Sequence, residues 1–151
     1  MHTRSAVLYS IVIYILSFIL GIFGLIIFGF DTNLTTVPTE IYLYGIAISI
    51  LLMMIFTRTY FQKSKIKPNA VSGAYFGFTT IVVGFLFDFL IGIVPLLFAE
   101  HGPDIMAYYS HPLFWANLAA IPVTSAITGS YLQKSSLTTK KTATKKSSKK
   151  S

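Results

Sequence analysis

Residues 71–98, VSGAYFGFTTIVVGFLFDFLIGIVPLLF, form an apolar stretch that contains one carboxylic acid, Asp88. The stretch is longer than the ~20 residues that a helix needs to cross a bilayer. An ionisable group at the bilayer centre costs about 3 kcal/mol or more, so we expect Asp88 to face protein or water rather than lipid. At helical spacing Gly73, Gly77 and Gly84 share a face with Asp88. We therefore interpret this face as a packing surface that ends in an acid.

The overall composition agrees with a membrane protein. Of the 151 residues 54% are hydrophobic and only 11% are charged, with a mean hydropathy of +0.68, which excludes an ordinary soluble domain. The chain has no cysteine, which excludes both a disulfide framework and a thiolate metal site.

Three further segments are apolar for about the length of a membrane span. With 71–98 they place the predicted spans at residues 6–30, 41–61, 71–98 and 113–132. The first run is longer than the apolar core of a signal peptide, and no small-x-small cleavage pattern follows it. The prediction is an all-α fold, an integral membrane four-helix transmembrane bundle over residues 1–132.

Small residues recur at helical spacing along three of these spans. Such residues let helix backbones approach closely in lipid. The predicted helix-packing positions are Ser17, Gly21, Gly24, Gly45, Ser49, Gly73, Gly77 and Gly84.

Residues 133–151 consist almost entirely of Lys, Ser and Thr. A segment of this composition buries too little apolar surface to offset its ordering entropy, so it is predicted to be a disordered basic tail. Lysines here and in the second connection are candidates for contact with anionic lipid headgroups. They are Lys63, Lys65, Lys67, Lys134, Lys140, Lys141, Lys145 and Lys146. Nucleic-acid binding is not expected, because no aromatic residue follows Tyr131 to stack on bases.

The sorting of charges between loops predicts the topology. The twelve Lys and Arg residues lie before the first span, in the connection from Arg58 to Lys67, and in the tail. The loops at residues 31–40 and 99–112 contain Asp and Glu but no Lys or Arg. The positive-inside rule places the basic segments in the cytoplasm. We expect a multi-pass protein of the cell membrane with both termini cytoplasmic.

The fourth predicted span is the most polar of the four. Asn117, Thr124 and Thr128 lie on one helical face, which we predict to neighbour Asp88, because a buried polar group needs a partner. Pro122 removes a backbone hydrogen bond and frees the carbonyl of Leu118. All bases are assigned to the cytoplasmic side, so the sequence favours a neutral or proton-exchanging Asp88 over an intramembrane salt bridge.

The search for enzymatic motifs is negative. There is no HExxH, no GxSxG and no phosphate-binding Gly-rich loop, so an enzyme is not expected and no cofactor is predicted. Potential metal ligands gather before the fourth span, but their spacing matches no recognised pattern and no metal site is predicted. They are Glu100, His101, Asp104 and His111.

Two functional hypotheses follow. The first is an accessory subunit or anchor that acts by helix–helix association, as a homo-oligomer or with a larger membrane partner. The alternative is a small proton- or cation-coupled transporter in which Asp88 is the exchanging site and Asn117, Thr124 and Thr128 line the path.

Overall fold

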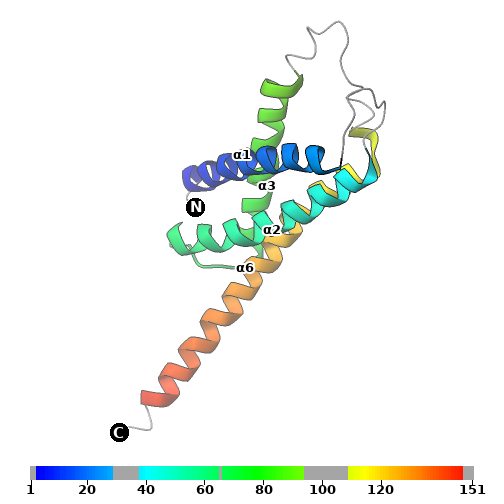
Figure 1. The fold of residues 1–151 in the computed structure, drawn as a ribbon. Coiled ribbons are helices and arrows are strands. Elements are labelled where there is room, and N and C mark those ends of the chain that lie inside the picture. The colour runs from blue at the N-terminus through cyan, green and yellow to red at the C-terminus, as the bar shows by residue number, and fades with distance from the viewer. Residues whose placement is uncertain (1–2, 29–37, 65, 94–108, 148–151) are drawn as a thin grey trace, which may run out of the picture.

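The computed structural model describes residues 3–28, 38–64, 66–93 and 109–147. Within these ranges the fold is all-α, as predicted, and no strand occurs. The helices are α1 (Thr3–Ile27), α2 (Thr39–Ser64), α3 (Ala70–Phe87) and α6 (Pro112–Ser147) (Figure 1). A wider π-helical turn, η1 (Asp88–Ile93), continues α3.

Three of the described helical segments are long and apolar enough to cross a membrane: Thr3–Ile27, Thr39–Ser64 and Ala70–Leu90. Their exposure pattern is the reverse of that of a soluble protein. Val71 and Ile26 are 79% and 70% exposed, whereas Ser10 and Thr57 are fully buried. Many large apolar side chains face outward while several hydroxyls are buried, which is the pattern expected of helices that lie in lipid. The chain is a membrane protein.

The fourth predicted span, residues 113–132, lies in α6, which is not among the three segments that are apolar enough to span. Asn117, Thr124, Ser125 and Thr128 make it more polar than the other helices. Its crossing of the membrane therefore remains a prediction.

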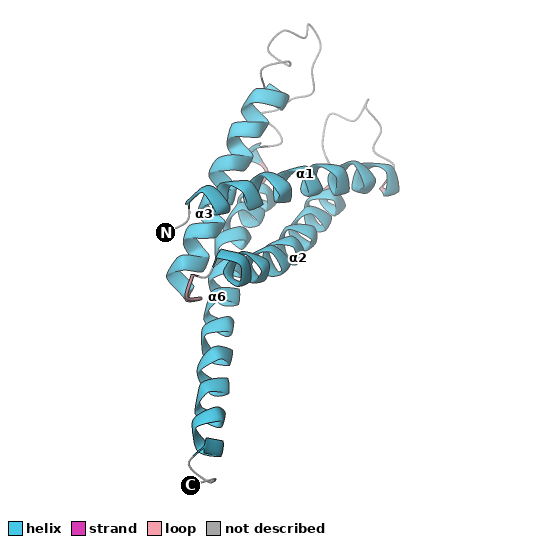
Figure 2. Cartoon of the chain, turned by 90° about the vertical axis from the view of Figure 1, so that its left-hand side faces the viewer, coloured by secondary structure: helices cyan, strands magenta, loops and turns pink. Residues whose placement is uncertain are grey.

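The disorder expected of residues 133–151 stays a prediction, although the structure describes the first part of this tail as helical. Residues 133–147 continue α6 as one helix that extends away from the other helices (Figures 1 and 2). This extension contains no Gly or Pro, and adding residues to an existing helix avoids the cost of nucleation. Residues 148–151 lie outside the described ranges.

Helix directions alternate along the chain. The numbers of the contacting residues rise together for α1 with α3 and for α2 with α6, so the helices of each of these pairs run in the same direction. The numbers change in opposite senses for α1 with α2 and for α3 with α6, so the helices of these pairs run in opposite directions. The contacts between α1 and α3 are Ser10–Thr80 and Tyr14–Asp88, and those between α2 and α6 are Tyr42–His111 and Thr57–Ser125. The contacts between α1 and α2 are Tyr9–Tyr60 and Leu20–Tyr44, and those between α3 and α6 are Gly73–Ser125 and Gly77–Pro122. Although directions alternate, α1 runs across α3 rather than alongside it in both views (Figures 1 and 2).

The closest helix crossing is that of α3 with α6. A methyl group built on Gly77 would lie 2.5 Å from the Cα atom of Pro122, and one built on Gly73 would overlap the backbone carbonyl of Ser125. Only glycine lets the two backbones meet at these positions. The C-terminal half of α3 lies past this crossing, and Asp88 follows it at the start of η1.

The core lies between α1, α2 and α3. The rings of Tyr60 and Phe76 stack with centroids 4.6 Å apart, and both side chains are almost completely buried, as are those of Met53 and Ala6. Asn69 caps the start of α3 by accepting a hydrogen bond of 2.7 Å from the Ser72 amide. These contacts fix α3 against its neighbours and so set the position of Asp88.

Candidate functional site

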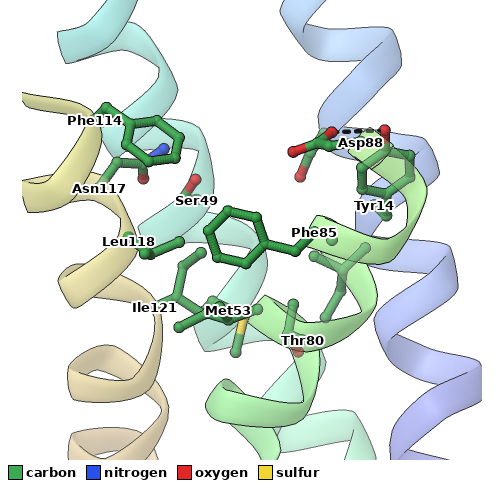
Figure 3. A pocket seen from close by; sticks show the side chains of 14 residues that line it. Tyr14, Ser49, Met53, Thr80, Phe85, Asp88, Phe114, Asn117, Leu118 and Ile121 are labelled. Carbon is green, nitrogen blue, oxygen red and sulfur yellow. Dashed lines mark hydrogen bonds between the residues drawn. The ribbon is translucent and has the colours of Figure 1, made fainter. Parts of the chain in front are cut away.

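A pocket of about 170 Å³ lies between α1, α2, α3 and α6 (Figure 3). Asp88 and Tyr14 lie on one side of it, and Ser49 and Asn117 lie on the other. Apolar side chains, among them Phe85, line the pocket between the two polar sides. The polar lining residues are Tyr14, Ser17, Ser49, Thr80, Asp88 and Asn117, and none of the lining residues in the described part of the chain is basic.

Asp88 is held by a tyrosine from the first helix. The Tyr14 hydroxyl donates a hydrogen bond of 2.9 Å to Oδ1 of Asp88. Stacking of the Tyr14 ring on Phe87, with centroids 4.9 Å apart, orients this hydroxyl. The backbone N–H of Asp88 donates to the carbonyls of Gly84 and Phe85, at the point where the α-helix gives way to the π turn. Turns of this kind are frequent at functional sites.

Two pairs of buried hydroxyls join the helices nearby. Ser10 and Thr80 lie 3.0 Å apart between α1 and α3, and Thr57 and Ser125 lie 2.8 Å apart between α2 and α6. Thr80 also lines the pocket. Hydroxyl pairs of this kind hold helices together in lipid, where an unpaired polar group is costly.

Asn117 supplies an acceptor without a donor. Its Oδ1 is buried and has no hydrogen-bond partner within the described residues. Its Nδ2 lies on the α2 side, 3.9 Å from where a methyl group on Gly45 would be. The carbonyl of Leu118, another lining residue, cannot receive the usual hydrogen bond from Pro122, because proline has no N–H. Both residues lie on the α6 wall of the pocket.

The structure brings together only some of the polar residues that the sequence predicts at this site. Asp88 and Asn117 line the same pocket, but Thr124 and Thr128 are not among its lining residues, and the Thr128 hydroxyl donates to the Thr124 carbonyl of its own helix. Because α6 runs opposite to α3, Thr124 lies near the level of Gly73, far from Asp88. Sequence reasoning missed Tyr14 as the partner, although it occurs on the small-residue face of the first span.

The predicted packing residues have three different environments. Gly73 and Gly77 contact α6, and Gly24 lies against the Tyr44 ring, whereas no atom lies within 4 Å of a methyl group built on Gly21. The others lie at the pocket: Ser17, Ser49 and Gly84 line it, and Gly45 lies beside Asn117.

The lysines predicted to contact lipid are only partly described. Lys63, Lys67 and Lys134 are exposed. Lys65 lies outside the described residues, and the structure places only the backbone of the lysines beyond residue 137. These are Lys140, Lys141, Lys145 and Lys146.

Of the potential metal ligands, only His111 is described; Glu100, His101 and Asp104 lie outside the described residues. Its Nδ1 accepts a hydrogen bond of 3.2 Å from the Leu113 amide at the start of α6, and its ring stacks on Tyr42 with centroids 4.1 Å apart. His111 thus acts as a helix cap. Within the described ranges, no three His, Asp or Glu residues are grouped to hold a metal ion.

Tyr109 marks the end of the pocket nearest the start of α6. Its ring lies edge-on to Phe114, a lining residue, with centroids 4.9 Å apart. Burial raises the pKa of Tyr109, and the nearby Asp88 carboxylate raises it further.

Comparison of the chain with protein-family models, curated proteins and solved structures finds no match, so the geometry of the pocket carries the functional argument.

Proposed function

We propose that this protein is a small multi-pass membrane transporter, coupled to protons or cations, in which Asp88 is the exchanging site. The observation that carries the proposal is the pocket itself. Four helices bring one carboxylate, a hydrogen-bonding tyrosine and the side-chain amide of Asn117 to a cavity within an apolar protein. Ionisable groups at such positions are expensive in a membrane and mark ion or substrate paths.

The depth of the pocket supports this function. Tyr14 lies near the middle of α1, roughly 16 Å from Thr3 at 1.5 Å per residue, and a bilayer core is about 30 Å thick. Ser49 lies near the middle of α2 in the same way. Asp88 itself lies near the end of the apolar segment Ala70–Leu90, so the support comes from its hydrogen-bond partner Tyr14 and from Ser49. A site near the middle of the spans is where alternating access needs it.

The proposal includes a fourth span in α6, with both termini on the cytoplasmic side of the cell membrane. Alternating helix directions are what four successive spans require, and the contacts of α6 with α2 and α3 fit that order. The basic residues at the ends of α1, α2 and α6 agree with the positive-inside rule. Lys63, Lys67 and Lys134 would then contact anionic headgroups.

Transport by the full chain in liposomes tests the proposal. We expect proton flux that depends on an added cation, with Na⁺, K⁺ or an organic cation supplied in turn, and a loss of at least tenfold in Asp88→Asn. That change removes the charge but keeps the side-chain shape. Glu40→Gln is the matched control, because Glu40 is exposed in the first turn of α2, away from the pocket. Equal flux in wild type and Asp88→Asn would overturn the proposal.

An accessory subunit or anchor is the second candidate, and the open space at Gly21 favours it. A small residue facing outward lets another helix approach. The small-residue face of α3 offers less support, because Gly73 and Gly77 are already covered by α6. Under this second function Asp88→Asn leaves partner recovery intact, so the same variant separates the two candidates.

A further inference from the structure

We propose that the outward face of α6 over residues 112–132 is a surface for lipid hydrocarbon, anchored by Trp115 at one headgroup layer and by Tyr131 at the other. This inference rests on the proposed function, which includes a fourth span, and deepens it by placing the two membrane boundaries on the molecule. It is carried by the exposed side chains of α6, by the spacing of its two exposed rings and by the change of composition after Leu132.

The exposed side chains of this segment are apolar or aromatic, although it is the most polar of the four predicted spans. They are Pro112, Trp115, Ala116, Ala119, Val123, Ile127 and Tyr131. The polar side chains of the same segment are buried or half-buried, and they are Asn117, Thr124, Ser125, Thr128 and Ser130. A mean over the whole segment combines the two faces and so hides the apolar one. An apolar outward face with the polar side chains turned inward is the pattern of a helix in lipid.

Five of the exposed side chains recur at every fourth position and form one strip along the helix, which consists of Trp115, Ala119, Val123, Ile127 and Tyr131. At 1.5 Å per residue, residues 112–132 extend over about 30 Å, which is the thickness of the hydrocarbon core of a bilayer. Trp115 and Tyr131 lie just inside its two ends, about 24 Å apart, and each is more than half exposed. Trp and Tyr are enriched at the two membrane–water interfaces. The strip therefore has the length and the end residues of a membrane crossing.

The exposed composition changes directly after Leu132. Gln133, Lys134 and Ser136 are polar and exposed, and the positive charge of Lys134 suits an anionic headgroup. The apolar strip and the polar extension thus meet within a few residues of Tyr131, where we place the inner membrane boundary.

Lipid fits this strip better than another helix does. Helix contacts in membranes favour small residues, and the one glycine of the segment, Gly129, is buried beside the Asn69 carbonyl at the start of α3. The outward side chains of Val123, Ile127 and Tyr131 are large. The side of α6 that is suited to close helix packing is therefore already occupied within the chain.

The position of Trp115 bears on the depth of the pocket. Phe114 and Asn117 line the pocket and lie within about 3 Å of Trp115 along the helix axis, so the α6 wall begins near the membrane boundary at the start of α6. The proposed topology makes this the outer boundary. Tyr14 and Ser49 line the pocket near the middle of their own helices. The pocket thus extends from near the middle of the membrane toward its outer boundary.

The depth of Trp115 can be measured without any substitution, because it is the only tryptophan of the chain. The full chain is reconstituted in phosphatidylcholine vesicles that carry bromine, which quenches tryptophan fluorescence, either close to the headgroups or close to the ends of the acyl chains. We expect bromine near the headgroups to quench Trp115 about twofold more strongly than bromine near the chain ends.

Moving the tryptophan along the strip gives the rest of the depth profile. In a Trp115→Phe background, Tyr131→Trp should repeat the headgroup pattern, whereas Val123→Trp should be quenched about twofold more strongly by bromine near the chain ends, because residue 123 is midway between the two rings. Ser136→Trp is the matched control. It is an exposed position of the same helix about 8 Å beyond Tyr131, and neither lipid should quench it strongly.

Two results would overturn the inference. Stronger quenching by headgroup bromine at residues 115, 123 and 131 alike would show that α6 lies along the membrane surface. A Val123→Trp protein that neither lipid quenches would mean that protein, such as a second copy of the chain, covers the strip. The transport assay is independent of this profile. Asp88-dependent flux with a wrong profile overturns only the lipid surface, and the expected profile without such flux overturns only the proposed function.

Discussion

Single polar residues are expected to contribute strongly to the stability of this protein, because they lie among apolar side chains. Thr57 is fully buried and shares a hydrogen bond of 2.8 Å with Ser125 on another helix. Thr59, two residues later on the same helix, is only partly buried, and its hydroxyl donates to the carbonyl of Ile55 in its own helix. The two threonines are thus a natural pair for measuring what an interhelical hydroxyl contact contributes.

Replacing Thr57 by valine should lower the free energy of unfolding by about 0.5–1.5 kcal/mol, since the shape is kept and one interhelical hydrogen bond is lost. Thr59→Val should change it by less than about 0.5 kcal/mol. Detergent-induced unfolding in mixed micelles, followed by circular dichroism, gives both values. Equal losses in the two variants would show that the Thr57–Ser125 contact contributes nothing specific.

At the scale of the helix, the glycines divide into those that another backbone covers and those that are open. Gly77 meets Pro122 of α6, and the atoms concerned are backbone atoms that cannot rotate away. Gly21 on α1 has nothing within 4 Å of an added methyl group. The same residue type therefore serves a helix crossing in one place and leaves an uncovered surface in the other.

Gly77→Ala should destabilise the fold by about 1–3 kcal/mol, because the methyl group overpacks the crossing of α3 and α6. Gly21→Ala should be neutral or stabilising by up to about 1 kcal/mol, since alanine has the higher helix propensity. Thermal unfolding of both variants in the same lipid checks the difference. A Gly77→Ala protein as stable as wild type would mean that the two helices do not meet at this position.

The sequence predicts elements well here, and their contacts poorly. Long apolar runs determine α1, α2 and α3, and Asp88 is conspicuous because charge is so rare in them. Helical spacing also places Asn117, Thr124 and Thr128 on one face. Residues on the same face can nevertheless lie at different heights along the helix axis. Since α3 and α6 cross at Gly77 and Pro122, only Asn117 is level with the pocket. The partner of Asp88 is Tyr14 of α1, and the packing of α1 on α3 that brings the two together is not encoded in either span alone.

For the whole molecule, the alternating directions of the helices and the distribution of basic residues point to one arrangement in the membrane. The absence of native cysteine makes this arrangement easy to examine, because any introduced thiol is the only one present. Suitable exposed positions exist at both proposed faces: Glu40 before the main part of α2, Lys67 in the second connection, and Ser136 on the extension of α6.

In intact cells a membrane-impermeant maleimide should label Glu40→Cys, whereas Lys67→Cys and Ser136→Cys should react only after the membrane is permeabilised. The three variants serve as controls for one another, since all three positions are exposed. Labelling of Ser136→Cys but not Lys67→Cys from outside would place the two segments on different sides and would exclude a spanning α6.

The continuity of α6 has a mechanical consequence. One unbroken helix carries Asn117 at the pocket, meets α3 at Pro122, and ends at Ser147. At 1.5 Å per residue the arm from Pro122 to Asn117 is roughly 7 Å long, and the arm from Pro122 to Ser147 is roughly 37 Å. For a stiff rod that pivots at the glycine contact, a displacement of about 1 Å at the short arm becomes about 5 Å at the free end. If α6 moved in this way, the tip of its basic extension would be displaced about five times as far as the end at the pocket.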